Sequence, residues 1–477
     1  MATLQGRLPG ADHAVVLGAS LAGMLSAAVL ARHFDKVTVI ERDRLPEGPA
    51  WRRGVPQARH AHNLMTMGHE AMERLFPGVR DELVDAGMVR VRMPQDMLLL
   101  TAGGWMPRFS TDLAMLTSSR DVIDWVIRRR LATVQNVQVV EEAEVVDLLT
   151  EDNAARVTGV RLRRKDAGAA QGWSTPEDLR ADFVVDATGR NTRTPDWLDA
   201  LGYGRPAESV VDAQTTYATC VFEPPAGHSA DWNCILLQYA PEAPRQGILN
   251  PIEEGRWMVS LATLGNKQPP TDMESFLEYA RTLRSPVLYE VLRDAEPVTP
   301  IYRSGRTENR RRHYERLRRW PDRFVVLGDA AGALNPSYGQ GMSVAAKAAL
   351  ELDEALDRAR RLDGLAAKLR RHVAKAIDIA WSIAATADLA YPWAADHVAL
   401  PVRMQLAYLY RVIAAVPGSR AASKALLDIN QMVTGPQAMG RPAVLAAALG
   451  TRGRATGDPG PPPAVISPDR AVPADVR

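Results

Sequence analysis

The chain has 477 residues, of which 46% are hydrophobic and 24% are charged, as in a globular protein with a large core and two or three substructures. The formal net charge of +2 at pH 7 gives no reason to propose a nucleic-acid partner, and we expect arginine runs such as Arg128–Arg130 and Arg310–Arg312 to be solvated. Only two cysteines are present, Cys220 and Cys234, which excludes a disulfide framework and predicts a cytoplasmic protein with no membrane partner.

The first predicted unit spans Ala14 to Asp43. An apolar run at Ala14–Gly18 predicts a buried strand, and Gly18–Gly23 predicts a tight turn. Leu21–His33 has the apolar spacing of a helix, and Lys36–Glu41 predicts a second strand that ends on an acid. Strand, glycine turn, helix and acid-ended strand are typical of dinucleotide binding.

This turn suits a pyrophosphate because a helix N-terminus offers unpaired N–H groups and a partial positive charge. Ser20 stands where the usual pattern has its middle glycine; its Cβ crowds the approach, while its hydroxyl can donate to a phosphate. The alternative, a membrane or signal helix over Ala14–Ala31, is disfavoured because glycines and Ser20 interrupt it. The predicted cofactor contacts here are Gly18, Ala19, Ser20, Leu21, Ala22, Gly23, Glu41 and Arg42.

A long loop follows, with Arg52, Arg53, His60 and His62; loops of this length are usually functional or disordered. We interpret Arg53 with Arg52 as anchors for a cofactor phosphate, with plain surface charge as the alternative. The two histidines could suggest a metal, but spacing places no third ligand, and a structural role at the loop or cofactor edge is favoured. The next predicted elements are a helix, capped by Ser118 or Ser119, and four strands: Arg120–Leu131, Val137–Glu141, Val145–Leu149, Val157–Leu162 with a break at Thr158-Gly159, and a strand within Ala181–Arg190.

The middle of the chain reads as a second, antiparallel sheet. Glu254-Gly255 predicts a hairpin turn, and Thr271–Glu274 predicts a capping box for a helix through Leu283. The predicted strands are Thr216–Phe222, Ile235–Tyr239, Gly247–Pro251 and Arg256–Leu261.

Arg323–Leu356 then returns to strand, glycine loop and long helix. Phe324–Leu327 predicts a buried strand, which places the carboxylate of Asp329 at the edge of the sheet where ligands collect. The loop Asn335–Met342 leads into a helix whose N-terminus is a second anion site.

We therefore predict an α/β fold with a Rossmann-like dinucleotide-binding domain, an antiparallel-sheet substrate domain and C-terminal helices. The expected boundaries are 1–200 for the first part of the dinucleotide-binding domain, 201–300 for the sheet domain, 301–365 for the second part, 366–450 for the helices and 451–477 for a disordered, proline-rich tail.

From Ala14 to Leu356 the chain resembles the FAD-dependent flavoprotein monooxygenases of the para-hydroxybenzoate hydroxylase-like class. The resemblance implies that Glu41 binds the adenosine ribose, that Asp329 binds the ribityl chain, and that Arg120 lies near the pyrophosphate. It also implies that backbone N–H groups at Gly341 and Met342 face the flavin's pyrimidine edge, after Pro336 of the family's GD…P motif. FAD is therefore the expected cofactor.

A narrower resemblance joins the runs Arg52–Leu64, Asp186–Arg190, Glu253–Trp257 and Asn335–Met342 to the actinobacterial polyether epoxidases of the monensin and lasalocid type. The class's usual DG motif appears here as Thr188-Gly189. NADPH or NADH could therefore reduce this flavin directly or through a separate flavin reductase. A flavin halogenase is not expected, because the chain has no lysine between Lys36 and Lys165 and no WxW motif.

The resemblance implies oxygen transfer from a flavin C4a-hydroperoxide, formed with O2, to an apolar polyketide-like substrate in antibiotic biosynthesis. Such an epoxidase or hydroxylase needs no further acid or base, and its catalytic residues stay unassigned. Two alternatives remain: a cyclase that uses FAD as a scaffold for a decalin-forming [4+2] cycloaddition, and a flavin-dependent double-bond reductase. Residues that could line the substrate cavity are His60, Tyr217, Gln238, Trp257 and Trp393, and no metal is expected.

Overall fold

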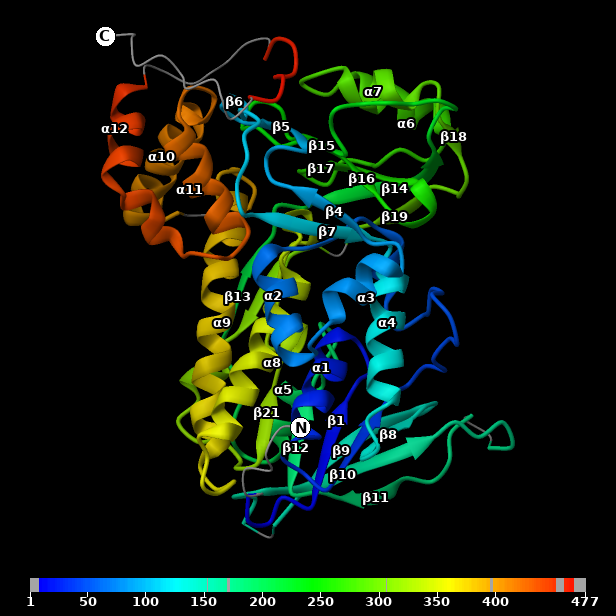
Figure 1. Cartoon of the computed structure of the whole chain (residues 1–477). Coiled ribbons are helices and arrows are strands. Elements are labelled where there is room, and N and C mark those ends of the chain that lie inside the picture. The colour runs from blue at the N-terminus through cyan, green and yellow to red at the C-terminus, as the bar shows by residue number, and fades with distance from the viewer. Residues whose placement is uncertain are drawn as a thin grey trace.

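The computed structural model describes residues 8–151, 153–169, 172–305, 307–394, 398–451 and 459–466. Figure 1 shows one nucleotide-binding unit in the lower half of the view, a second sheet with two helices above it, and a helical cluster beside that sheet. The predicted α/β fold with an antiparallel sheet and C-terminal helices is confirmed. No helix of the described residues is long and apolar enough to cross a membrane.

A five-stranded parallel sheet forms the centre of the nucleotide-binding unit, in the order β21-β12-β1-β2-β8. Four of its strands are short runs, mostly apolar, that are almost wholly buried, as parallel sheets require, while the edge strand β8 is partly exposed. From β1 the chain adds β2 and β8 on one side and β12 and β21 on the other, so a crevice opens at the carboxyl ends of β1 and β12. The strands are β1 (His13–Leu17), β2 (Lys36–Ile40), β8 (Val137–Val140), β12 (Phe183–Asp186) and β21 (Phe324–Val326).

Helices cover this parallel sheet, and α1 packs against α8. The capping serine of α4 is Ser119, whose Oγ accepts from Val122 N at 3.4 Å. The helices are α1 (Leu21–Leu30), α2 (Thr66–Leu75), α3 (Val79–Asp85), α4 (Arg120–Ala132), α5 (Thr194–Ala200) and α8 (Gly341–Asp357).

An antiparallel ribbon packs beside the parallel sheet in the order β11-β10-β9. The expected break at Thr158-Gly159 is a shift of register within β10, and the strand continues through it. Gly159 permits this because its φ is +147°. The strands are β9 (Ala143–Thr150), β10 (Val157–Arg164) and β11 (Glu177–Arg180).

The largest sheet has the order β18-β14-β17-β16-β15-β5-β6, with β19 paired to β14. Glu254 and Gly255 form the hairpin turn between β16 and β17 with φ of 61° and 74°. Two of its strands, β5 and β6, come from residues before 201, and β5 runs parallel to β15. The strands are β5 (Met97–Thr101), β6 (Gly104–Trp105), β14 (Thr216–Glu223), β15 (Cys234–Leu237), β16 (Arg245–Pro251), β17 (Trp257–Thr263), β18 (Glu296–Pro297) and β19 (Tyr302–Ser304).

Helices α6 (Met273–Arg281) and α7 (Val287–Leu292) cover one face of this sheet and share its apolar core. The capping box of α6 lies one residue later than expected. Asp272 Oδ1 accepts from Ser275 N at 2.8 Å, and Ser275 Oγ accepts from Asp272 N, so Thr271 and Glu274 are not the pair.

Two small sheets complete the strands. One has the order β3-β7-β4, and the other has the order β13-β20-β22. Their strands are β3 (His62–Leu64), β4 (Val89–Arg92), β7 (Ala114–Ser118), β13 (Glu208–Val211), β20 (Asn309–Arg312) and β22 (Gly332–Ala333).

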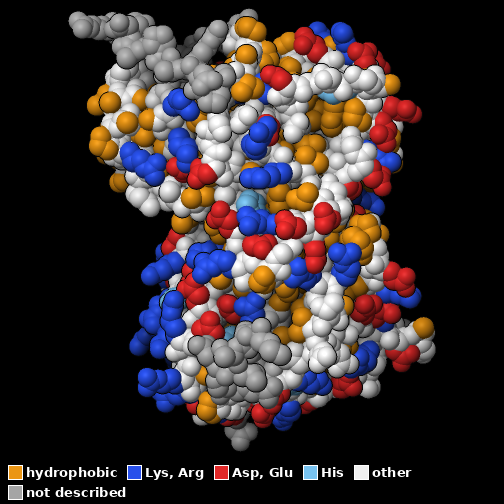
Figure 2. All heavy atoms as spheres, in the orientation of Figure 1, with side chains coloured by type: hydrophobic (Ala, Val, Ile, Leu, Met, Phe, Trp, Pro, Cys, Tyr) orange, Lys and Arg blue, Asp and Glu red, His pale blue; other side chains and the backbone are white. Residues whose placement is uncertain are grey.

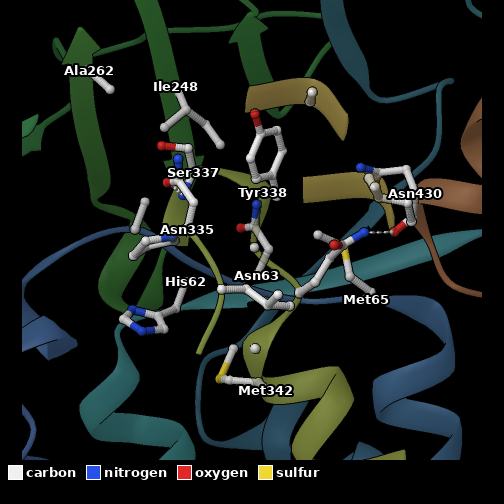
Figure 3. A pocket seen from close by; sticks show the side chains of 18 of the residues that line it. His62, Asn63, Met65, Ile248, Ala262, Asn335, Ser337, Tyr338, Met342 and Asn430 are labelled. Carbon is white, nitrogen blue, oxygen red and sulfur yellow. Dashed lines mark hydrogen bonds between the residues drawn. The ribbon is translucent and has the colours of Figure 1, made fainter. Parts of the chain in front are cut away.

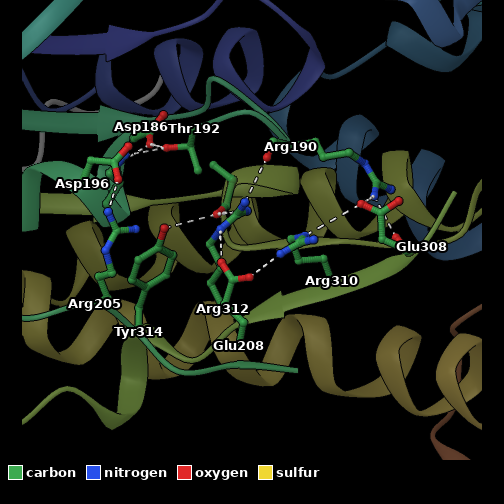
Figure 4. A network of polar contacts seen from close by, with 12 residues as sticks. Asp186, Arg190, Thr192, Asp196, Arg205, Glu208, Glu308, Arg310, Arg312 and Tyr314 are labelled. Atoms are coloured by element: carbon green, nitrogen blue, oxygen red, sulfur yellow. Dashed lines mark hydrogen bonds and ion pairs between the residues drawn. The ribbon is translucent and has the colours of Figure 1, made fainter. Parts of the chain in front are cut away.

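The arginines of β20 correct the expectation of a solvated run. Arg311 and Arg312 are both 8% exposed, and Arg310 and Arg312 pair with Glu208 across the β13–β20 ladder. Figure 4 shows this ion-pair network beside the nucleotide-binding sheet. Elsewhere on the face in Figure 2, basic and acidic side chains are interspersed, as expected for a solvated surface.

The C-terminal helices extend from the nucleotide-binding unit to the large sheet. The long helix α9 (Leu365–Asp388) packs along α8, and the remaining three cluster beside β5 and β6 (Figure 1). They are α10 (Leu400–Ala415), α11 (Arg420–Asn430) and α12 (Pro442–Gly450). Of the predicted tail, 452–458 and 467–477 lie outside the described residues, while 459–466 contacts β6 and its loop, with Ile466 N donating to Arg108 O at 2.8 Å.

Candidate functional site

A cavity of about 830 Å³ lies between the two sheets, within the usual range for small-molecule sites. Its walls include the turn after β1, the loop before β3, the start of α4, the turn after β12, the large sheet, and the segment from Gly328 to the C-terminal helices. Figure 3 shows His62, Asn63 and Met342 on one side of this pocket and Ile248 and Ala262 on the other.

The glycine turn after β1 has the geometry that its sequence predicts. Gly18 has a φ of +92°, and a Cβ there would lie 2.8 Å from Ala187 O. A Cβ at Gly23 would lie 1.8 Å from Gly18 O, so both positions require glycine. Among the described residues no side chain caps the N-terminus of α1, and the first turn holds no acid. Its N–H groups, beside Ser20, Leu21 and Ala22 of the cavity wall, therefore remain available to an anion.

Glu41 lies directly beside this turn at the end of β2. Its carboxylate accepts from Ala19 N at 2.7 Å and from Asp43 N at 2.9 Å. Arg52 Nη1 lies 3.1 Å from Glu41 Oε2, and Arg52 Nη2 donates to Ala19 O. Arg52 is thus the arginine that fixes the acid and the turn together.

Two other arginines that were predicted to contact the cofactor do not line the cavity. Arg42 and Arg53 are exposed and do not line it. Because Glu41 and Asp43 pair with Arg52, its neighbour Arg53 is left facing solvent. The structure therefore favours Arg52 over Arg53 as an anchor of the predicted phosphate loop.

Arg120 lies where the two halves of the nucleotide site meet. It is 5% exposed at the start of α4, and its Nε donates to Asp124 Oδ1 at 2.7 Å. Its Nη2 donates to Ser20 Oγ at 3.4 Å, which ties it to the turn before α1. The guanidinium lines the cavity, so a buried cation is held next to the anion-binding helix end.

The second half-site follows β21. Gly328 has a φ of +60°, and a Cβ there would lie 2.8 Å from Ala22 Cβ, so this loop lies against the first turn. Asp329, Pro336, Gly341 and Met342 all line the cavity, and α8 begins at Gly341 without a side-chain cap among the described residues. Burial raises the pKa of Asp329, with nearby Arg190, Arg120 and Arg312 opposing the rise.

Asp186 at the end of β12 organises the turn that replaces the usual DG motif. Its carboxylate accepts from the hydroxyls of Thr188, Thr192 and Thr194, with 2.6 Å for Thr188 and Thr194 (Figure 4). Arg190 in the same turn lines the cavity, where it pairs with Glu308 at 3.0 Å and donates to Leu334 O.

His60 and His62 lie on the cavity wall as neutral rings. Burial lowers the pKa of each to about 3, with a further contribution from nearby positive groups. His62 Nδ1 donates to His60 O at 2.8 Å, and His60 Nδ1 bonds Thr219 Oγ1 at 2.9 Å. No three metal-ligating side chains are grouped in the described part of the chain.

Strand alternation decides which predicted substrate residues reach the cavity. Tyr217 and Gln238 line it, and the Tyr217 ring meets the His60 ring edge-on at 4.4 Å. Trp257 does not: on β17, Ser260 and Ala262 face the cavity, so Trp257 faces α6 and α7 in the opposite core. Trp393 is also absent from the wall; its Nε1 donates to Ala213 O at 2.9 Å.

The end of the cavity away from the glycine turn is apolar. None of the lining residues from 93–115 or 382–439 carries a charge. The structure places the C-terminal helices in this wall. Apolar lining residues from the β4–β7 region and from α9 to α11 include Met93, Met97, Leu99, Met106, Met115, Ile383, Leu406, Leu409, Ile413, Leu426 and Leu427.

One buried polar group at this site carried no signal in the sequence. Asp388, the last residue of α9, is 0% exposed and accepts from Asn309, Asn335 and Tyr338. Asn335 and Tyr338 belong to the glycine loop before α8, so Asp388 fastens that loop to α9.

Comparison with known proteins agrees with this geometry. Residues 12–387 match the family model described as FAD binding domain. The chain is 35% identical over 387 residues to Protein Rv3254 of Mycobacterium tuberculosis, across 80% of this chain and 81% of that protein.

Solved structures share the fold at low identity. The flavin-dependent brominase Bmp2 aligns with a TM-score of 0.64 at 14% identity, over 91% of this chain and 97% of that one. PqsL of P. aeruginosa, in complex with 2-aminobenzoylacetate, aligns at 0.59 and 18%, over 79% and 95%. The flavin-dependent halogenase CmlS aligns at 0.60 and 18%, over 90% and 77%.

The residues of this site fit a flavin nucleotide such as FAD. Two uncapped helix N-termini and the Arg120 cation suit the diphosphate and the electron-rich ring edge of a flavin nucleotide. Asp329 places a carboxylate on the cavity wall, where it would accept from hydroxyls of such a nucleotide, while Glu41 lies behind the turn and outside the lining residues. The Gly18–Gly23 turn leaves no room for a Cβ at either end, as the tight turn and the close packing of α1 on β1 in a dinucleotide-binding unit require.

Proposed function

Because the chain belongs to the FAD binding domain family, whose model covers residues 12–387, we propose that it is an FAD-dependent monooxygenase. In this proposal it acts as an epoxidase or hydroxylase that transfers one atom of O2 to an apolar, polyketide-like substrate of secondary metabolism. NADPH or NADH is the reductant, directly or through a separate flavin reductase.

One observation carries the proposal. The cofactor half-sites and an uncharged apolar chamber are two ends of the same cavity. A flavin held by the α1 and α8 N-termini therefore faces a space that excludes charged molecules and disfavours water. Oxygen transfer to an alkene or aromatic carbon needs this arrangement, because water would divert the activated oxygen.

The chain's own residues bind and orient the cofactor. N–H groups at the start of α1 would hold its diphosphate, with Arg120 beside them, and Asp329 on the cavity wall and Glu41 behind the turn would accept hydrogen bonds from its hydroxyls. The uncapped α8 N-terminus, at Gly341 and Met342, favours negative charge at the pyrimidine edge. When bound, FAD supplies the redox chemistry that activates O2.

The neutral histidines of the cavity wall suit the proposed oxygen transfer. His60 and His62 stay uncharged across the physiological range, because burial lowers the pKa of each to about 3. They therefore bring hydrogen-bonding capacity to the wall without a cation or a readily released proton.

The test is product mass. FAD-loaded protein is incubated with NADPH, a flavin reductase, O2 and candidate polyenes, and we expect a product heavier by one oxygen atom. A reduced enzyme that consumes O2 but never modifies any candidate contradicts the proposal.

The uncharged chamber also favours a second function, a cyclase that uses FAD as a scaffold. A [4+2] cycloaddition needs only a shaped apolar space that enforces the reactive conformer, and none of the lining residues from 93–115 or 382–439 carries a charge. Its product has the same mass as its substrate, so the same measurement separates the two, and a gain of two hydrogens would indicate a double-bond reductase.

A further inference from the structure

Helix α12 exposes an apolar face at the outer edge of the C-terminal helical cluster. Its sequence, PAVLAAALG, contains no charged or hydrogen-bonding side chain, and only Val444 and Ala448 are buried in the core that it shares with α10 and α11. Leu445 is 39% exposed and Leu449 is 75% exposed. Figure 2 shows apolar side chains gathered where Figure 1 places α12. A helix that is apolar all round is normally covered by protein or by lipid, so this face indicates an interaction surface.

Helix α10, which packs against α12, adds a second exposed stripe. Leu400 and Met404 lie about one turn apart and are 66% and 65% exposed. Arg403 and Arg411 are exposed on the same side of the helix, because their positions follow Leu400 by whole helical turns. We call these four side chains, together with the two exposed leucines of α12, the α10–α12 surface.

The charge of this part of the chain is one-sided. Residues 398–451 carry five basic side chains and one acid, Asp428, although the whole chain has a net charge of only +2. That acid is buried and already pairs with Lys424 and Arg441. No acid of the described residues pairs with either arginine of the α10 stripe, so the surface combines apolar side chains with uncompensated positive charge. A second copy of the chain is a poor occupant, because two such surfaces would repel each other.

The substrate chamber reaches the protein surface at the same helix. Gln405 lines the cavity and is also exposed, so the cavity opens to the outside beside Met404. Leu406 and Leu409 of the same stretch of α10 line the cavity. An apolar molecule that lies against this surface is therefore next to an apolar opening.

We propose that the α10–α12 surface binds a lipid bilayer with anionic headgroups and that the protein takes its apolar substrate from that bilayer. The exposed leucines and Met404 enter the boundary between headgroups and acyl chains, while Arg403 and Arg411 contact lipid phosphates. The protein lies on the membrane without spanning it. The source of the substrate is the one part of this proposal that rests on the proposed function.

This proposal departs from the sequence prediction of no membrane partner. That prediction rested on the low net charge and on the lack of a spanning segment, and neither property reports a surface assembled by the fold. The basic and apolar side chains of α10 and α12 are spread over about fifty residues of sequence. Their packing in one cluster creates a local excess of four positive charges that the acidic residues elsewhere conceal in the total.

The probe is a pair of vesicle preparations, one of phosphatidylcholine alone and one of phosphatidylcholine with phosphatidylglycerol. Full-length, FAD-loaded protein with oxidised flavin is mixed with each, and the fraction that floats with the vesicles is measured. We expect binding to the anionic vesicles and at least tenfold weaker binding to the neutral ones. Binding should weaken as salt is added, because salt screens the attraction of the arginines to the headgroups.

The apolar contribution is tested with the double variant Leu445→Ser, Leu449→Ser. We expect it to bind anionic vesicles at least tenfold more weakly than the natural protein, because the side chains that enter the bilayer are lost. The matched control is Val84→Ser, Val298→Ser, which removes apolar side chains that are 45% and 41% exposed outside the cluster. The control should bind like the natural protein.

The charge contribution is tested with Arg403→Gln, Arg411→Gln. We expect at least tenfold weaker binding to anionic vesicles and a smaller dependence on salt. The control is Lys368→Gln, Arg371→Gln, which removes the same number of positive charges from exposed positions in the first half of α9. Melting temperatures and flavin spectra like those of the natural protein show that each variant is folded.

Failure to bind anionic vesicles would overturn the proposal, and so would equal binding by the natural protein and both α10–α12 variants. Light scattering tests the other occupant. A dimer that the leucine variant breaks, in a protein that does not bind vesicles, would assign the surface to a second copy and overturn the proposal. These measurements need no substrate, O2 or reduced flavin, so their failure is distinct from failure of the proposed monooxygenase function.

Discussion

Replacing Asp388 with asparagine removes a buried titrating group, and the effect on stability depends on pH in a direction that the structure fixes. Burial raises the pKa of Asp388 from 3.8 to about 6 in the folded protein. Between these values the folded chain binds a proton that the unfolded chain has lost. The natural protein therefore loses stability as pH rises from about 4 to about 6.

The magnitude follows from the size of the shift. About two pKa units correspond to about 3 kcal/mol of unfolding free energy, at about 1.36 kcal/mol per unit. The amide of the Asp388→Asn variant would also face the two amide donors of Asn309 and Asn335, which adds a cost that does not depend on pH. We therefore predict that the difference in unfolding free energy between the variant and the natural protein shifts in favour of the variant from pH 4 to pH 7.

Urea unfolding at several pH values, followed by tryptophan fluorescence, measures this difference. Thr386→Val is the matched control, because it alters the same turn of α9 without a titrating group. We expect the denaturation midpoints of Asp388→Asn to gain on those of the natural protein as pH rises. Parallel midpoints at all pH values would show that Asp388 does not carry the raised pKa.

Three further variants test the site. Gly18→Ala should weaken FAD binding at least tenfold, or about 1.4 kcal/mol, because Gly18 has a positive φ and a carbonyl close to its Cβ position. Gly48→Ala is the control and should bind FAD normally, because no atom lies near its Cβ position. Equal FAD affinities of the two variants, measured by flavin fluorescence, would refute this. Ile248→Trp should fill the chamber and abolish product formation while the FAD content stays constant. Leu249→Ile is the control and should keep product formation, because Leu249 faces the other core. Product from Ile248→Trp would count against the chamber as the substrate site. His62→Gln should gain stability relative to the natural protein as pH falls from 8 to 5. The lowered pKa of His62 means that below about pH 6.5 the unfolded chain binds a proton that the folded chain does not, which makes folding of the natural protein less favourable. A difference in melting temperature that does not change with pH would argue that His62 is not desolvated.

Local pattern was enough to predict the nucleotide-binding unit. Buried parallel strands are continuous apolar runs, and the Gly18–Gly23 turn has steric requirements that only glycine meets. The first and last strand–turn–helix units could therefore be predicted from the sequence. The structure places them together, with Gly328 against Ala22.

What the sequence could not predict depends on contacts between distant segments. Trp257 was expected in the cavity, but which face of β17 is covered by α6 and α7 follows only from the assembled sheet. The pairing of β5 with β15 joins residues more than a hundred positions apart, and no local signal marks it. Asp388 is one of two acids in α9, an amphipathic helix, and only the fold brings Asn309, Asn335 and Tyr338 to it.

Reduction of the bound flavin tests the central claim most directly. The visible spectrum of FAD-loaded protein would be followed under anaerobic conditions as NADPH is added, first alone and then with a flavin reductase. The proposal predicts bleaching of the oxidised flavin, directly if the Thr188-Gly189 turn admits hydride transfer and otherwise once the reductase is present. A flavin that stays oxidised in both cases would contradict a monooxygenase and favour a protein in which FAD is a scaffold.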